Sequence, residues 1–100
     1  MKIQKKDILS YLKKNKKLFY QKYNIIKIGI FGSYARNEQT ENSDIDILIT
    51  MTNDTKDIFG KRLALRDLIS EKFSRPVDVC HEKAIKPIFK EIIFKDAVYV

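Results

Sequence analysis

The chain has 100 residues, of which 44% are hydrophobic and 33% are charged. This length predicts one domain with a single core and leaves no room for a second, substrate-holding domain. No apolar run approaches the roughly 18 residues that a membrane span requires, so we expect no membrane association. The net charge of +7 comes mostly from lysine, and a lysine-rich composition alone does not identify a partner.

Cysteine content and the first residues bear on the cellular compartment. Cys80 is the single cysteine, so the chain forms no internal disulfide. Residues 1–7 are charged and lack the apolar stretch and cleavage site of a secretory signal. Both features are typical of a protein that works in a reducing environment, and we expect a cytoplasmic location.

A helix and a strand are predicted first along the chain. Residues 5–23 carry apolar side chains at helical spacing with lysines between them, and a break is expected near Asn15. Residues 25–31 form a β-branched run that predicts a buried strand. The lysines of the helix are interpreted as a solvated face rather than a nucleic-acid contact.

The segment after this strand predicts a tight turn and a short helix. Gly32-Ser33 interrupts the apolar run, and residues 34–36 suit a single helical turn. Asn37 stands where this turn ends, and asparagine tolerates the left-handed backbone that helix ends often need.

A second strand is predicted over residues 44–50, after a polar loop. Side chains alternate between the two faces of a strand. One face is expected to carry Asp44, Asp46 and Leu48, and the other Ile45, Ile47 and Ile49. The two aspartates therefore project on the same side, roughly 6.5–7 Å apart along the backbone.

Three more elements complete the predicted fold. A helix capped by residues 53–55 and ending near Phe73 should bury Ile58, Leu65, Leu68, Ile69 and Phe73. Gly60 weakens the first part of this helix and favours a late start. A third strand over residues 76–80 points Asp78 away from its two flanking valines. A last helix beginning at Pro87 is expected to bury Ile88, Phe89, Ile92 and Ile93, and residues 97–100 should be extended. This order predicts an α+β domain with a small mixed sheet flanked by helices.

The three strand-borne carboxylates are the first chemical signal. If the second and third strands are neighbours, Asp44, Asp46 and Asp78 converge and repel one another unless a cation is present. Oxygen-only ligands favour Mg²⁺ or Mn²⁺ over zinc. His81 is the only histidine and does not suffice for a zinc site.

A phosphate cradle is the second signal. A strand that ends in Gly32-Ser33 lets the backbone approach an anion closely, and the following helical turn directs N–H groups toward it. Ser33 adds a hydroxyl, and Arg36 lies one turn further on. Each of these features alone is common in ordinary turns and strands, and it is their combination that indicates chemistry.

This combination resembles a known signature. The chain reads Phe31-Gly32-Ser33-Tyr34-Ala35-Arg36 and, after a polar loop, Ser43-Asp44-Ile45-Asp46. These motifs resemble the Gly-Ser and Asp-x-Asp elements of the DNA polymerase beta-like nucleotidyltransferase superfamily, in particular its minimal members, the MntA-like antitoxins. Val77-Asp78-Val79 matches the place of the third carboxylate. The family often has glycine where this chain has Asn37, which can adopt the same backbone conformation.

The resemblance implies a function and roles for these residues. Asp44, Asp46 and Asp78 would hold two Mg²⁺ ions, and Asp78 would also assist deprotonation of the acceptor. Gly32 and Ser33 would bind the β- and γ-phosphates of ATP, with Arg36 nearby. The chain would transfer AMP from ATP to a tyrosine of a HEPN ribonuclease toxin, as an antitoxin in a hetero-oligomer with that toxin.

Three alternatives stay open at this point. The chain could be a non-catalytic antitoxin that covers its partner, although the intact carboxylates argue against lost activity. It could modify a small molecule or RNA, although related antibiotic-modifying enzymes have an additional domain. It could bind nucleic acid directly, which we do not expect because no basic motif with interleaved aromatics is present.

Overall fold

The computed structural model describes residues 2–100 and shows a four-stranded sheet with helices on both faces. The elements in chain order are α1 (Lys5–Lys14), α2 (Lys16–Tyr23), β1 (Ile25–Phe31), α3 (Gly32–Ala35), β2 (Ile45–Met51), α4 (Ile58–Phe73), β3 (Val77–His81), the 3-10 helix η1 (Glu82–Ala84), α5 (Pro87–Asp96) and β4 (Val98–Tyr99). The predicted α+β class and the helix break at Asn15 are confirmed.

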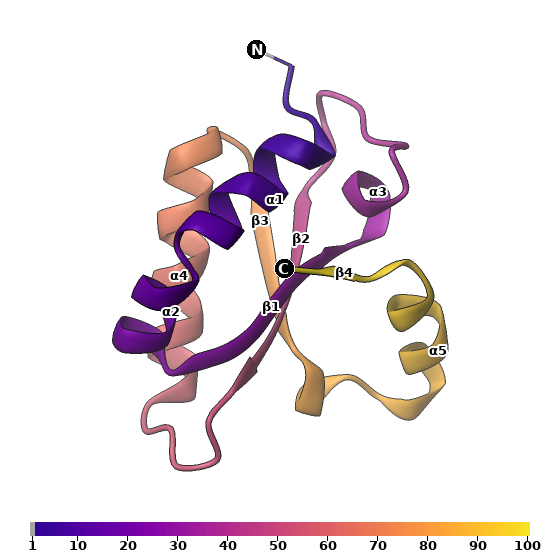
Figure 1. Ribbon diagram of the computed structural model, residues 1–100. Helices are drawn as coiled ribbons and strands as arrows, with labels where there is room; N and C mark the ends of the chain where they lie inside the picture. Colours follow the sequence, from indigo (N-terminus) through magenta and orange to yellow (C-terminus); the bar gives the residue numbers. More distant parts are fainter. Residues whose placement is uncertain (1) are drawn as a thin grey trace.

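The sheet is mixed, with strand order β3-β2-β1-β4. β1 runs antiparallel to β2 and β4, whereas β2 and β3 are parallel and α4 forms the crossover between them. Helices α1, α2 and α4 lie on one side of the sheet, and α3 and α5 lie on the other (Figure 1). The two sides therefore differ: three helices cover one side, whereas the other carries the four-residue helix α3 and the single longer helix α5.

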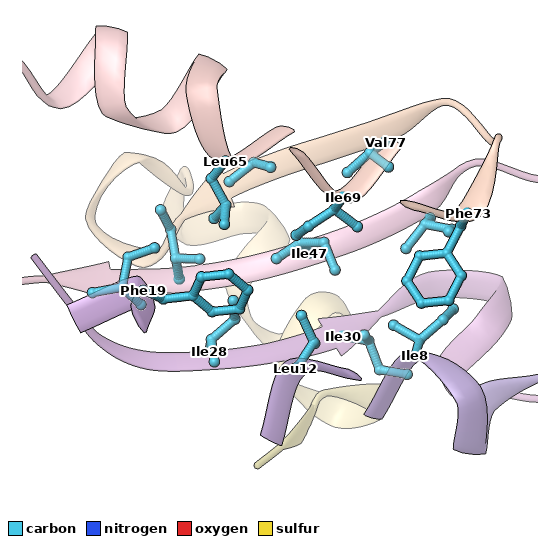
Figure 2. Close-up of a cluster of buried hydrophobic side chains, with 14 of the residues drawn as sticks. Ile8, Leu12, Phe19, Ile28, Ile30, Ile47, Leu65, Ile69, Phe73 and Val77 are labelled. Carbon is cyan, nitrogen blue, oxygen red and sulfur yellow. The ribbon is translucent and has the colours of Figure 1, made fainter. Parts of the chain in front are cut away.

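The hydrophobic core lies between the sheet and the layer formed by α1, α2 and α4 (Figure 2). Ile8, Leu12 and Phe19 of the N-terminal helices meet Leu65 and Ile69 of α4 over the central strands, and all five are fully buried. The predicted inward face of β2 is confirmed, because Ile45, Ile47 and Ile49 are fully buried and belong to this core. Burial of this kind of side chain contributes about 1.5–3 kcal/mol per residue to folding.

Two details of the strands depart from simple alternation. The β1–β2 register shifts between Ile25 and Lys27, and this irregularity leaves Ile26 exposed in a strand that the sequence predicted as buried. Leu48 is fully buried even though it points to the same face as Asp46, and it lies outside the main core cluster. The carboxylate face of the sheet is thus covered at its middle.

Helix α4 begins later than the caps predicted at residues 53–55. Asp57 is the residue before the helix, with a left-handed backbone, and its Oδ1 accepts a hydrogen bond from the Gly60 N–H at 3.1 Å. The apolar stripe was predicted correctly for Leu65, Ile69 and Phe73, which are buried, but Ile58 is exposed. The prediction for Ile58 was wrong because the first turn of α4 extends past the core.

The prediction of a buried face on the last helix was also wrong. None of the residues of α5 is buried, and Ile88, Phe89 and Ile92 are exposed. Helical spacing shows that a helix has an apolar face, but it does not show whether the same chain covers that face. The extended segment after α5 is confirmed as β4, which pairs with Gly29 and Ile30 at the edge of β1.

Within residues 2–100, the helices are all too short or too polar to traverse a lipid bilayer.

Candidate active site

Asp46 and Asp78 are cross-strand neighbours at the centre of the candidate site. They pair in the parallel register of β2 and β3, so their side chains project on the same face of the sheet. Val77 and Val79 are buried on the opposite face, whereas Asp78 is exposed and Asp46 is half-buried. The sequence analysis stated adjacency of these two strands only as a condition for convergence of the carboxylates, and the β2–β3 pairing meets that condition. Asp44 immediately precedes β2 and is exposed.

The electrostatics of Asp46 reflect this crowding. Burial is the largest cause that raises the pKa of Asp46 to about 6, followed by the negative charges of Asp78 and Asp44, and the charge of Arg36 opposes the shift. A carboxylate in such surroundings gains from a cation that neutralises its neighbours. The carboxyl of Asp46 therefore keeps its proton up to about pH 6, and a cation can take the place of that proton.

The donor set fits magnesium. No three Asp, Glu, His or Cys side chains in the described part of the chain are already gathered closely enough to enclose a metal ion. Mg²⁺ does not need such an enclosure, because it usually binds through one or two carboxylates and completes its shell with water and substrate phosphates. The pair Asp46–Asp78 supplies this kind of partial site, with Asp44 as a further carboxylate close enough to affect the pKa of Asp46.

Gly32 is placed directly against Asp46. It has a left-handed backbone with a φ of +74°, and a Cβ atom at this position would lie 2.2 Å from Oδ2 of Asp46. Phe31, the residue before it, is the register partner of Asp46 across β1 and β2. The sequence predicted a glycine for close approach of an anion, and the structure adds that only glycine leaves room for the carboxylate.

Ser33 and Asn37 delimit the turn that follows. Ser33 lies in the single turn of α3, is half-exposed, and its hydroxyl accepts or donates no hydrogen bond within residues 2–100. Asn37 has a φ of 58°, which confirms the left-handed ending predicted for this turn. The Ser33 hydroxyl is therefore available to a ligand at the strand end that carries Gly32.

Arg36 makes contacts that the sequence did not predict. Its Nε donates to Oε2 of Glu38 at 3.1 Å, and its Nη1 donates to Oδ2 of Asp96 at 3.3 Å. The hydrogen bond with Glu38, then that with Asp96, raises the pKa of the guanidinium. Arg36 thus links α3 to the end of α5, and it would have to exchange a carboxylate for a phosphate to bind one.

Two arginines that sequence reasoning overlooked lie beside Asp78. Arg62 and Arg66 of α4 line a small cavity of about 90 Å³ together with Leu63, Asp78 and Val79. The pair is separated by four residues, which puts both side chains on one face of a helix, and this spacing was a usable signal. A larger cavity of about 830 Å³ lies at α1 and the end of α4 and contains none of the predicted site residues.

The other end of the carboxylate face holds a polar cluster around Glu82. Its carboxylate accepts hydrogen bonds from Thr50 of β2, at 2.8 Å, and from Tyr99 of β4, and it forms an ion pair with Lys27 of β1 at 3.3 Å. Burial raises the pKa of Glu82, but the hydrogen bonds from Tyr99, Thr50 and Lys27 outweigh it, and the net shift is downward. The Glu82 side chain therefore links the end of β3 to β1, β2 and β4. No sequence motif indicates this cluster.

Cys80 and His81 complete the strand that carries Asp78. Cys80 is half-buried, pairs in register with Leu48 and points to the same face as Asp78. Burial, followed by the charge of Asp78, raises the pKa of its thiol.

His81 is buried, its pKa is lowered by burial and then by Lys83, and its Nδ1 accepts a hydrogen bond from the Lys83 N–H at 3.1 Å. His81 has a structural place at the end of β3.

Comparison with known proteins gives a consistent result. The family model described as Nucleotidyltransferase domain matches residues 8–100. A provisionally named protein adenylyltransferase of Methanocaldococcus jannaschii is 45% identical over 95 residues, which cover 94% of this chain and 95% of the relative. Protein adenylyltransferase MntA of Thermococcus cleftensis is 30% identical over 96 residues, covering 94% and 93% of the two chains.

Solved structures share the fold. A provisionally named minimal nucleotidyltransferase matches with a TM-score of 0.78 at 20% identity, over 96% of this chain and 95% of its own. A toxin–antitoxin crystal structure with AMP-PNP matches with a TM-score of 0.68 at 21% identity, over 97% and 72%. A tri-AMPylated HEPN toxin of Shewanella oneidensis in complex with MNT antitoxin matches with a TM-score of 0.58 at 18% identity, over 95% and 66%.

Proposed function

The chain belongs to the nucleotidyltransferase domain family, among its minimal, MntA-like members, and we propose that it transfers AMP from ATP to a tyrosine of a HEPN ribonuclease toxin and thereby neutralises the toxin. The observation that carries the proposal is the register pairing of Asp46 with Asp78 beside Gly32. The names of its relatives as protein adenylyltransferases support the reaction, and the toxin–antitoxin complexes of the same fold support the kind of partner.

The proposed reaction is an in-line displacement at the α-phosphate of ATP. The acceptor oxygen forms a bond to the α-phosphorus, the bond from that phosphorus to the bridging oxygen of the β-phosphate breaks, and pyrophosphate leaves. Asp78, exposed on the edge strand β3, receives the proton of the acceptor hydroxyl. Asp44, Asp46 and Asp78 would hold Mg²⁺, which when bound offsets the charge that gathers on the phosphates.

The Gly32-Ser33 turn holds the leaving phosphates in this proposal. The Gly32 backbone lies against the carboxylate of Asp46, and the Ser33 hydroxyl beside it has no competing partner in the described chain. A phosphate contact by Arg36 stays a prediction, since it requires exchange of Glu38 or Asp96. An AMP group on a toxin tyrosine would add bulk and negative charge where the toxin has to bind RNA phosphates.

The direct test is incubation of the purified chain with α-labelled ATP, Mg²⁺ and the product of the neighbouring gene, which the proposal expects to be a HEPN protein. We expect label on a tyrosine of the HEPN protein, located by mass spectrometry, and loss of its ribonuclease activity. Asp46→Asn should abolish labelling. Asp54→Asn, which changes an exposed aspartate on the loop after β2, is the matched control and should label normally.

The outcomes separate the alternatives. Neutralised ribonuclease without label would show a non-catalytic antitoxin that acts by binding and would refute the proposed transfer. Label on RNA or on a small molecule, with an unlabelled HEPN protein, would refute the proposed acceptor.

A further inference from the structure

Helix α5 carries the two most exposed large apolar side chains among residues 2–100, Ile88 and Ile92. Ile88, Phe89 and Ile92 are 76%, 51% and 67% exposed. Their positions i, i+1 and i+4 place them on one side of the helix. Contiguous exposed apolar patches on a folded domain commonly mark sites of interaction with another protein.

The position of α5 is defined even though none of its residues is buried. Pro87 opens the helix, and Asp96 at its end accepts a hydrogen bond from Arg36 of the turn after α3. The chain then continues directly into β4, which pairs with β1. A helix of ten residues is marginal in water without packing, so these attachments at its ends hold an apolar surface ready for a partner.

The location of this surface connects it with the reaction. α5 lies on the same side of the sheet as α3 (Figure 1), and the ion pair of Arg36 with Asp96 joins its end to the turn that begins at Gly32. A macromolecule that covers α5 therefore lies next to the carboxylate face. The cavity that Asp78 helps to line is small, about 90 Å³, and contacts made elsewhere on the acceptor can supply the positioning of its hydroxyl.

The charges around the apolar side chains indicate the chemistry of the partner. Lys86, Lys90 and Lys95 are exposed on or beside α5. Glu91 is the one exposed acidic residue of the helix, because Asp96 is half-buried and paired with Arg36. A second copy of this chain docked here would oppose lysines to lysines, in a protein of net charge +7. An apolar patch with an acidic border is the complementary surface.

We propose that Ile88, Phe89 and Ile92 of α5 form the docking surface for the acceptor protein, which covers them with an apolar patch bordered by acidic residues. This inference rests on the proposed function, because it assumes a protein acceptor. The surface sets the affinity for the acceptor, while the carboxylates and the Gly32-Ser33 turn perform the transfer. Docking on α5 thus completes a site that the 100 residues form only in part.

The test compares AMP transfer to the adjacent-gene HEPN protein by the wild-type chain and by the double variant Ile88→Ser/Ile92→Ser. The side chains are exposed, so the variant should keep the wild-type melting temperature and the wild-type affinity for ATP, measured by calorimetry in Mg²⁺. We expect the KM for the HEPN protein to rise about tenfold or more, the usual scale for loss of central interface side chains, while kcat at saturating acceptor is retained.

A matched double variant serves as the control. Leu18→Ser/Ile26→Ser removes apolar side chains that are 40% and 55% exposed on α2 and β1, and it should leave the KM unchanged. Phe59→Ser removes the exposed aromatic side chain of α4 and should also leave it unchanged. An unchanged KM in the α5 variant, or an equal rise in either control, would overturn the assignment of the surface.

Two further results distinguish the ways in which the inference can fail. If the wild-type chain is a dimer by light scattering and Ile88→Ser/Ile92→Ser makes it a monomer, the surface binds a second copy and the proposal is overturned. If the wild-type chain labels no tyrosine of the HEPN protein, the proposed function itself fails. Transfer by the wild type that is insensitive to the α5 variant overturns the docking surface alone.

Discussion

Gly32 and Asp46 occupy adjoining space: a Cβ atom on Gly32 would lie 2.2 Å from the Oδ2 atom of Asp46. Gly32→Ala should therefore displace the carboxylate and strain a backbone whose φ is +74°. We expect AMP transfer to fall at least tenfold. Gly60→Ala is the matched control, because its Cβ atom would lie 2.2 Å from Oδ2 of Asp57 at the start of α4. It should lower the melting temperature and leave the transfer rate of the folded protein unchanged, and a similar loss of transfer in both variants would contradict the prediction.

Replacement of Asp78 separates chemistry from folding. Asp78→Asn removes one of two neighbouring negative charges, so the metal-free protein should be as stable as wild type or slightly more stable. Transfer should fall by about 10²-fold or more, the scale for loss of acid–base assistance. Thermal unfolding in EDTA and AMP transfer in Mg²⁺, measured on one preparation, check both parts. Full activity, or a loss explained by a collapsed melting temperature, would refute the assigned role.

The pKa of Asp46 predicts a pH dependence of stability in EDTA. The folded-state pKa of about 6 lies above the ordinary value of 3.8. Between these two pH values, Asp46 keeps its proton in the folded state and has lost it in the unfolded state. The contribution of Asp46 to stability is therefore greatest at low pH and is lost as the pH rises through about 6. The melting temperature of Asp46→Asn minus that of the wild type should therefore be larger at pH 7.5 than at pH 4.5. An equal difference at both pH values would contradict the assignment.

Glu82 is predicted to be a stabilising residue with no part in the reaction. Glu82→Gln weakens its bonds with Lys27, Thr50 and Tyr99 and should cost on the order of 2 kcal/mol at pH 7, measured by urea unfolding. Because the folded-state pKa is lowered, this contribution is present above the ordinary pKa of glutamate and is lost as the pH falls through the folded-state value. The deficit should therefore shrink in acid, and a reduced kcat in the folded variant would contradict a purely structural role.

Local pattern was sufficient for β1, for the ending of the turn after α3 and for the side on which each carboxylate projects. The run over residues 25–31 is β1 as observed, and Asn37 has the predicted backbone, because strands and turn endings depend on neighbouring residues. The side on which Asp46 and Asp78 project also follows from alternation within each strand. Their adjacency depends on which strands pair, and the sequence could state it only as a condition.

Features that depend on distant contacts could not be predicted. The Arg36–Asp96 pair joins residues 60 positions apart, and no local signal distinguishes it from a phosphate contact. The position of the N-cap at Asp57 depends on where α4 meets the sheet. The acidic and polar residues before it are equally good N-cap residues, so the local sequence does not show where the helix begins. The exposure of Ile88 and Ile92 depends on how much surface the rest of the chain has left to cover them.

The raised pKa of Cys80 has a consequence for the redox behaviour of the site. Burial and the nearby charges of Asp78 and Asp46 disfavour the thiolate, and the opposing charge of Arg62 does not restore it. Since the thiolate is the species that reacts with electrophiles and oxidants, the Cys80 thiol on the carboxylate face should resist both. Iodoacetamide should alkylate Cys80 of the native protein far more slowly than that of the urea-unfolded chain, and AMP transfer should survive an oxidant dose that inactivates enzymes with low-pKa cysteines.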